Sequence, residues 1–357
     1  AICQFIAAPG LGILSDRFGR RPILLFCMLG SALGYLMFGI GGSLAVLFLA
    51  RIIDGITGAN FSVAFAYIAD LTPPDERGKF FGWVGAIAGI GFIFGPAIGG
   101  LLAKIDLSAP LYFAAAITFA NLLFGLLFMP ESLDKAHRET HIEIARLNPL
   151  SALGQVLAVP QLRWLLIAIF LYYLPFAALT GIIGLFAKDA LNWDAAAIGS
   201  LFALVGISDI VVQGLLLPRL LKRFGEGKVV VGGLIGQLVG YVLAASVVVV
   251  PSPLLMYLGV LILAAGDGLL GPALGGLLSR AAGSRSQGQV QGGSQSMQAL
   301  ARIIGPLGGG ELYDRVGHAT PYLSGVGFVA ITLTALSVAL PRVPRSAPAD
   351  EAPVAAG

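Results

Sequence analysis

The feature that most constrains this chain is a succession of apolar runs, each long enough to cross a membrane. A helix that spans the hydrocarbon core of a bilayer needs about 20 mainly apolar residues. Ten runs of this kind occur, at 22–40, 44–69, 79–103, 109–129, 161–187, 195–217, 229–250, 253–279, 289–311 and 319–340. Hydrophobic residues make up 57% of the chain and charged residues 11%, whereas soluble domains carry about 25% charged residues. The sequence therefore predicts an all-α polytopic membrane protein.

Residues 1–14 have the composition of the end of one further apolar helix. They contain neither an initiator methionine nor the basic region of a signal peptide. We expect about 11 helices in this chain and a missing N-terminal helix.

The polar residues argue against several classes of function. The sequence contains no GxxxxGK[ST] motif, so coupling to ATP is not expected. Cys3 and Cys27 stand alone in apolar stretches. His137 and His141 are four residues apart and could bind a metal ion, but a solvated linker is the favoured interpretation. We expect no enzyme, no metal site, no organic cofactor and no nucleic-acid partner.

Positive charge is distributed unevenly between alternate connections. Of the 22 Lys and Arg residues, 17 fall in one set of connections and the tail, and only Lys104, Lys188 and Arg315 fall in the other. Because Lys and Arg are retained on the cytoplasmic side, the first set is predicted to be cytoplasmic. This predicts a multi-pass protein of the inner (plasma) membrane with a cytoplasmic C-terminus.

The stretch from Gly12 to Arg21 carries four charges between two apolar runs, which predicts a tight turn in water. Its Arg-Phe-Gly, at 17–19, recurs at 223–225, and the Gly-Pro-x-x-Gly-Gly of 95–100 recurs at 305–310. These nearly constant offsets indicate two similar bundles. In this alignment Asp16 corresponds to Lys222, so the second turn is expected to lack the acid.

The longest polar connection separates the two copies. We predict an N-terminal bundle at 1–129, a cytoplasmic central loop at 130–160, a C-terminal bundle at 161–340 and a disordered Ala/Pro-rich tail at 341–357.

Three motifs together resemble the major facilitator superfamily. They are the turn at 12–21, the Arg51 and Gly55 pair in the run 44–69, and the glycine–proline motif of the fifth family helix. That last motif is associated with antiporters in the superfamily and consists here of Gly91, Gly95, Pro96, Gly99 and Gly100. The resemblance implies two six-helix bundles, with family helices 2–6 in the first half and 7–12 in the second. It also implies a conformational gate of charges formed by Gly12, Asp16, Arg17, Gly19, Arg20, Arg21 and Asp70, with Asp16 near the positive N-terminal end of family helix 11.

Within the superfamily, the sequence is most similar to the tetracycline-type proton antiporters. The segments 14–22, 55–59, 67–70, 130–132, 148–150 and 288–292 carry this likeness. Two departures concern the membrane aspartates of that group: Gly34 stands where one is expected, and 229–250 contains no acid.

Charged residues inside spanning segments are costly and mark functional sites or ion pairs. The interior polar candidates for proton coupling or substrate binding are Arg51, Asp54, Asn60, Asp209, Asp267, Gln298 and Arg302. For Arg51 and Asp54, simple neutralisation on one helix face is the alternative. Arg302 could be a structural counter-ion of Asp267, and Asp209 could join helices.

These observations favour a proton-coupled secondary transporter that exports a small amphipathic or drug-like molecule by alternating access. Its energy source would be the proton gradient, and its partners would be the substrate, protons and the lipid bilayer, with a monomer as the expected state. Two alternatives remain open: a metabolite symporter or uniporter of the same fold, and a transport-inactive membrane scaffold or sensor.

Overall fold

The computed structural model describes residues 1–58, 60–134, 138, 149–282 and 287–342. Every regular element in these ranges is a helix. The first half contains α1 (Ile2–Phe18), α2 (Arg20–Ile40), α3 (Leu44–Thr57), α4 (Asn60–Leu71), α5 (Arg77–Ala103) and α6 (Ala109–Phe128). A connecting helix, α7 (Pro149–Ala158), precedes the second half. The second half contains α8 (Pro160–Leu191), α9 (Ala195–Asp209), the π-helix η3 (Ile210–Leu216), α10 (Leu217–Ser246), α11 (Pro253–Ala281), α12 (Gln287–Arg315), α13 (Thr320–Ala339) and a short 3-10 turn, η5 (Leu340–Arg342).

Seven helical segments of the described chain are long and apolar enough to cross a membrane. They are Arg20–Ile40, Leu44–Leu71, Ala109–Phe128, Pro160–Leu191, Ala197–Ser246, Pro253–Ala281 and Thr320–Ala339. The fifth covers most of two of the predicted runs, 195–217 and 229–250. The remaining predicted spans, α1, α5 and α12, are helical but lie outside this set.

Two glycines with positive φ make the duplicated turn. Gly19 has φ 103° between α1 and α2, and Gly225 has φ 76° inside α10. An L-residue with a side chain rarely adopts such angles, so both copies of Arg-Phe-Gly need their glycine to reverse the chain. The repeat found in the sequence therefore corresponds to a repeated backbone turn.

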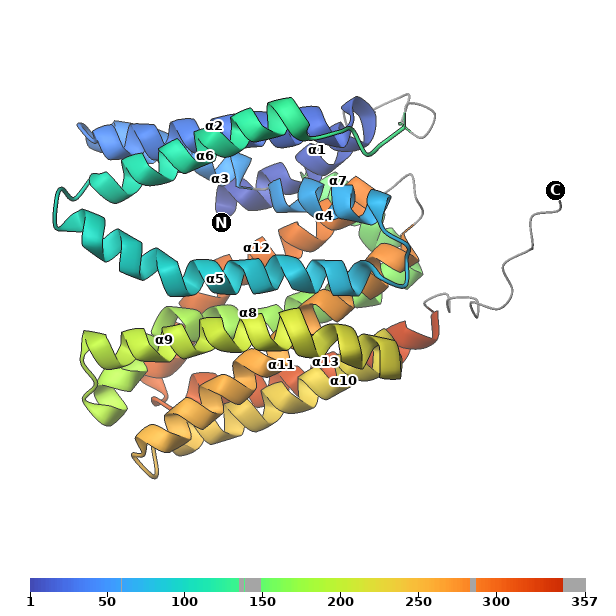
Figure 1. Ribbon diagram of the computed structural model, residues 1–357. Helices are drawn as coiled ribbons and strands as arrows, with labels where there is room; N and C mark the ends of the chain where they lie inside the picture. The colour runs from blue at the N-terminus through green and yellow to red at the C-terminus, as the bar shows by residue number, and fades with distance from the viewer. Residues whose placement is uncertain (59, 135–137, 139–148, 283–286, 343–357) are drawn as a thin grey trace.

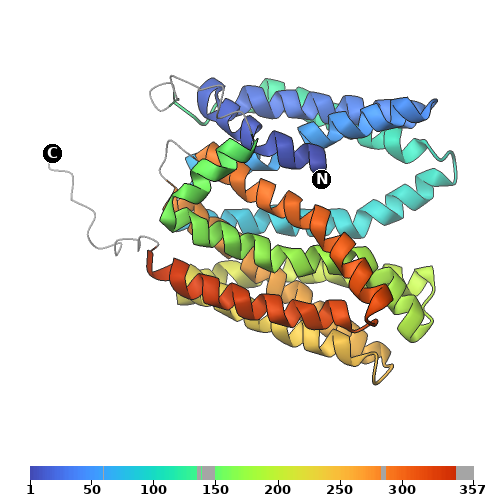
Figure 2. The same ribbon diagram turned by 180° about the vertical axis from the view of Figure 1, so that it is seen from behind.

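The two halves form separate groups of helices (Figure 1). Helices α2, α3 and α6 lie at the top of that view, and α10, α11 and α13 lie at the bottom, as the reverse view also shows (Figure 2). Helix α5 belongs to the first half in sequence but packs mainly on α9, η3 and α11 of the second. Helices α1 and α4 likewise pack on α12.

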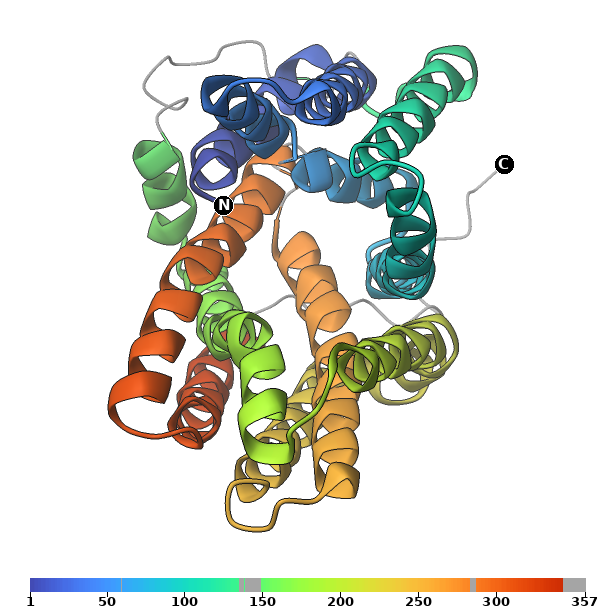
Figure 3. The same ribbon diagram turned by 90° about the vertical axis from the view of Figure 1, so that its left-hand side faces the viewer.

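We call the end of the molecule where α1 ends and α2, α5 and α12 begin the basic end. It lies at the right of Figure 1, and Figure 3 views the molecule from the opposite end. The two halves meet closely there. A side chain added at Gly12 of α1 would overlap the backbone carbonyl of Gly288 in α12, and one at Gly292 would lie 2.7 Å from the carbonyl oxygen of Ala8. Only glycine allows these helices such an approach.

The described glycines of the antiporter motif in α5 do not make tight contacts between the halves in this structure. A side chain added at Gly91, Gly95 or Gly99 would meet nothing within 4 Å. The close contacts of α5 lie nearer the basic end, at Gly78, Gly82, Gly85 and Gly89, against η3, α9, α10 and α11. Pro96 and Gly100 belong to the parts of α5 whose side chains are not described.

The predicted central loop at 130–160 includes helix α7 at 149–158. Leu153 and Val156 are buried there, three residues apart on one face, and α7 packs on α1, α8 and α12. Residues 139–148 of that loop, with His141, lie outside the described residues, as do His137 and the predicted tail beyond 342.

Candidate functional site

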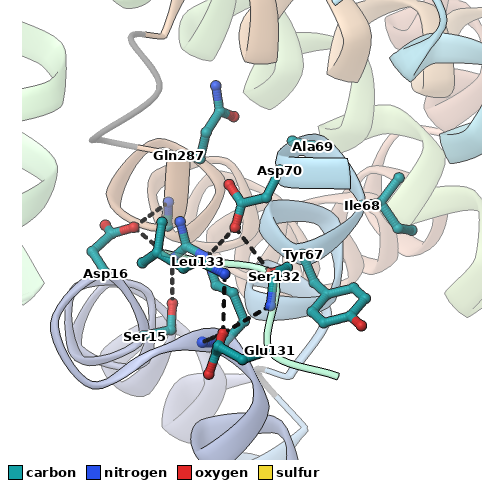
Figure 4. Close-up of polar contacts among 12 residues, drawn as sticks. Ser15, Asp16, Tyr67, Ile68, Ala69, Asp70, Glu131, Ser132, Leu133 and Gln287 are labelled. Atoms are coloured by element: carbon teal, nitrogen blue, oxygen red, sulfur yellow. Dashed lines mark hydrogen bonds and ion pairs between the residues drawn. The ribbon is translucent and has the colours of Figure 1, made fainter. Parts of the chain in front are cut away.

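A buried arginine lies at the centre of the charged turn. Arg20, at the start of α2, has a fully buried side chain. It donates hydrogen bonds from Nη1 to Asp16 Oδ1 (2.5 Å) and from Nε to Asp70 Oδ2 (2.9 Å). Asp70 is at the end of α4, so the hydrogen bonds of Arg20 join α1, α2 and α4 of the first half. Figure 4 shows the two acids, Asp16 and Asp70. Of the three arginines predicted for this gate, Arg20 is the one that binds both acids.

Asp16 carries the connection across to the second half. The backbone N–H of Gly288 donates to its Oδ1 (3.0 Å), and the N–H of Gln289 donates to its Oδ2 (2.9 Å). The first N–H groups of a helix have no partner within the helix, and they lie at its positive end. The carboxylate of Asp16 is therefore stabilised at the N-terminal end of α12. Burial raises the pKa of Asp16 to about 6, against the opposing effects of Arg20 and of the two N–H groups.

The other predicted gate residues have supporting roles. Gly19 makes the turn, and Gly12 permits the close approach of α12. Arg17 lies over the ring of Phe18, and Arg21 donates to the carbonyl oxygen of Leu126 at 2.6 Å. Neither forms an ion pair in the described part of the chain.

Two residues that sequence reasoning did not assign complete this cluster. Glu131 accepts the backbone N–H of Arg20 at 2.8 Å, and Ser132 donates to Asp70 at 3.1 Å (Figure 4). Both directly follow the last apolar run of the first half. Their sequence signals are this position, at the same membrane surface as the turn, and their place in the segment 130–132 that resembles the tetracycline-type antiporters.

A second cluster of polar contacts lies at the basic end, around the second turn. The expectation that this turn lacks an acid was wrong, because Glu226 supplies one. Glu226 directly follows Gly225 and forms a buried ion pair with Arg280 (2.8 Å). Arg77 of α5 donates from Nη1 to the carbonyl oxygen and hydroxyl of Ser279, at 3.1 and 3.2 Å. The acid is absent at the aligned position, Lys222, but is supplied four residues later.

We expect the packing of the basic end to depend on pH through Asp16, because its carboxyl group is buried between the halves. When the halves separate there, Asp16 meets water and its pKa returns towards the ordinary value of 3.8. The packed state therefore binds the proton more tightly, and acidification from about pH 7 to about pH 5 favours packing. Spin labels at Phe128 and Phe224, exposed at the basic end of each half, measure this distance. An Asp16→Ala variant is expected to respond less, and a packed fraction that falls on acidification would contradict the assignment.

A cavity of about 460 Å³ lies between the two halves. Helices α1, α4 and α5 form its wall on one side, and α8, η3, α11 and α12 form the other. Its lining is mainly aromatic and amide-bearing, with Phe61, Phe65, Phe81, Tyr172, Tyr173, Gln4, Gln213, Gln291, Gln295 and Gln298. This volume lies within the range of small-molecule sites, about 300–1,000 Å³.

The predicted interior residues divide into those that line this cavity and those that do not. Arg302 and Gln298 line it. Asp209 and Asp267 lie behind its wall. Asp209 accepts a hydrogen bond from the cavity residue Gln213 (3.0 Å), beside the π-helix η3, and Asp267 accepts one from Gln237 (3.4 Å). Asn60 begins α4 but is not part of the lining.

Asp54 and Asp267 have different charge environments. Arg51 lies 3.6 Å from Asp54 on α3 and packs on the ring of Phe38, which agrees with mutual neutralisation on one helix face. In contrast, no Lys or Arg of the described chain lies within 4 Å of Asp267. The possible pairing of Arg302 with Asp267 is thus not observed.

Two similar helical halves that enclose a cavity, with interior carboxyl groups at its wall, define a class of membrane transport protein. The sequence matches the family model of the Major Facilitator Superfamily over residues 1–306, and the chain belongs to that superfamily. It is therefore a multi-pass membrane transporter of small molecules rather than an enzyme.

Named relatives include resistance proteins of bacteria. The chain is 35% identical over 307 residues to the class C tetracycline resistance protein of Escherichia coli, which covers 86% of this chain and 76% of that protein. It is 30% identical over 333 residues to Multidrug resistance protein 2 of Bacillus subtilis, with coverage of 93% and 82%. The crystal structure of the human organic anion transporter MFSD10 (TETRAN) has a TM-score of 0.86 at 27% identity, over 94% of this chain and 81% of that one.

Proposed function

We propose that this chain is a proton-coupled transporter that exports a small amphipathic or drug-like molecule by alternating access. Its basic end faces the cytoplasm, together with the C-terminus, in the inner (plasma) membrane. The energy source is the proton gradient without a further cofactor, and the functional unit is the monomer.

The observation that carries this proposal is the cavity between the halves. Five aromatic rings and five amide side chains line it, a combination suited to molecules with a flat apolar body and several polar substituents. The names of the relatives agree, since tetracycline resistance and multidrug resistance proteins are among them.

The proposed direction of opening follows from the glycine contacts. The halves are packed at the basic end by Gly12 and Gly292, whereas Gly91, Gly95 and Gly99 of α5 have open space around them. With the basic end in the cytoplasm, this is an outward-facing state. The antiporter motif of α5 would then pack against the second half when the outer side closes.

The proposed proton site is Asp267. A carboxyl group in the membrane interior marks a proton pathway when no cation neutralises it, and Asp267 meets that condition while Asp54 has Arg51. Asp267 also lies within electrostatic range of Tyr172, which lines the cavity, and of Asp209.

The function is tested with the full-length protein in proteoliposomes that contain a pH-sensitive dye. An imposed pH gradient is expected to drive uphill movement of tetracycline, ethidium or fluorescein, with protons moving in the opposite direction. Movement of substrate in the same direction as protons would instead establish the symporter alternative. An absence of flux for every compound in a broad panel would support the scaffold alternative.

A further inference from the structure

Arg302 is the single charged side chain among the described residues that line the cavity. It projects from α12, on the second-half wall, and lies within the predicted membrane-spanning run 289–311. A cation at such a depth is expensive unless a partner compensates its charge.

Among the described residues, the partners of Arg302 are neutral side chains. Its Nη2 donates to Gln4 Oε1 at 3.1 Å, and its guanidinium lies 5.8 Å from the ring centre of Tyr173. No carboxylate of the described residues lies within 4 Å of it. A guanidinium has five N–H donors in a fork that fits carboxylate and sulfonate oxygens, so most of this donor capacity is available to a ligand.

The rest of the cavity restricts what that ligand can be. Phe61, Phe65 and Phe81 come from the first half, and Tyr172 and Tyr173 face them from the second. Such rings favour stacking with a flat aromatic body. Ser294 and the glutamines offer neutral hydrogen bonds without adding a charge.

We propose that Arg302 binds the anionic group of the substrate, and that the substrates are flat aromatic or polycyclic organic anions. The inference rests on the proposed function, because it takes this cavity as the transport site. Gln4 holds Arg302 across the two halves, and the anionic group replaces the amide oxygen of Gln4 when substrate binds.

Direct binding tests this separately from transport. Fluorescein and rhodamine 123 share a xanthene ring system but carry opposite charges. Their binding to the purified full-length protein in nanodiscs is measured by fluorescence anisotropy, with empty nanodiscs subtracted. Fluorescein is expected to bind about tenfold or more tightly than rhodamine 123, since a charge-assisted bond contributes about 1.5–3 kcal/mol.

Three variants locate the effect. Arg302→Gln is expected to remove the preference for fluorescein. Gln4→Glu is expected to do the same with Arg302 retained, because the new carboxylate would occupy the guanidinium. Arg315→Gln, which removes an exposed positive charge from the same helix, is expected to leave binding unchanged.

The outcomes separate the inference from the proposed function. Equal affinity for both dyes, tighter binding of rhodamine 123, or failure of both dyes to bind overturns the anion assignment. So does a preference that survives in both Arg302→Gln and Gln4→Glu. The proposed function fails instead if anions bind selectively at Arg302 but no proton-driven flux occurs in proteoliposomes.

Discussion

The Asp267→Asn variant is expected to lose proton-driven transport completely while still exchanging substrate across the membrane. Asparagine keeps the shape of the side chain and an oxygen that can accept the hydrogen bond from Gln237, but it cannot take up and release a proton. Uphill efflux under a pH gradient should therefore fall to background. Counterflow of labelled against unlabelled substrate, which needs no net proton movement, should persist.

The matched control is Asp209→Asn, a carboxyl-to-amide change in the same half. Asp209 accepts a hydrogen bond from Gln213, four residues further along the same helical segment. We therefore expect Asp209→Asn to cause a smaller loss of proton-driven transport. If Asp209→Asn abolishes coupling and Asp267→Asn does not, the proton site is misassigned. If both variants transport uphill normally, proton coupling does not involve this pair.

The fold was largely predictable because a spanning helix can be recognised from a single continuous stretch of sequence. The length of each apolar run predicts one helix, and the recurrence of Arg-Phe-Gly identified the turns that Gly19 and Gly225 make with positive φ. The central helix α7 was missed because Leu153 and Val156 occupy too short a segment for the length criterion that found the spans.

The candidate site was predictable only in part, because its geometry depends on contacts between distant segments. The sequence predicted a cluster of Asp16, Asp70 and three arginines, but which arginine is buried depends on how each is placed around the turn between α1 and α2. In the structure it is Arg20, the first residue of α2. Glu226 was missed because position-by-position alignment of the two copies compares Asp16 with Lys222. The aromatic wall of the cavity has no local signal, since Phe61 and Phe81 resemble any other lipid-facing residues until α4 and α5 are placed.

The Asp16→Ala variant is expected to open the basic end. The change removes the acceptor of three donors at once: Arg20 Nη1 and the N–H groups of Gly288 and Gln289. Each buried donor left without a partner costs about 1–3 kcal/mol, and separation of α1 from α12 lets water satisfy the two backbone groups. Because 1.4 kcal/mol corresponds to a tenfold change in an equilibrium constant, the ratio of packed to open molecules should fall by about tenfold or more.

Distances between spin labels at Phe128 and Phe224 report the two populations, with Cys3 and Cys27 replaced by alanine. Asp16→Asn is the graded control. Its remaining oxygen can accept from Arg20 and Gly288, but its NH₂ group faces the N–H of Gln289, so its packed fraction should lie between those of the native protein and Asp16→Ala. Glu76→Ala removes an exposed acid at the start of α5 and should leave the distances unchanged. Identical distance distributions for the native protein and Asp16→Ala would show that the glycine contacts of α1 with α12 hold this end closed without the carboxylate.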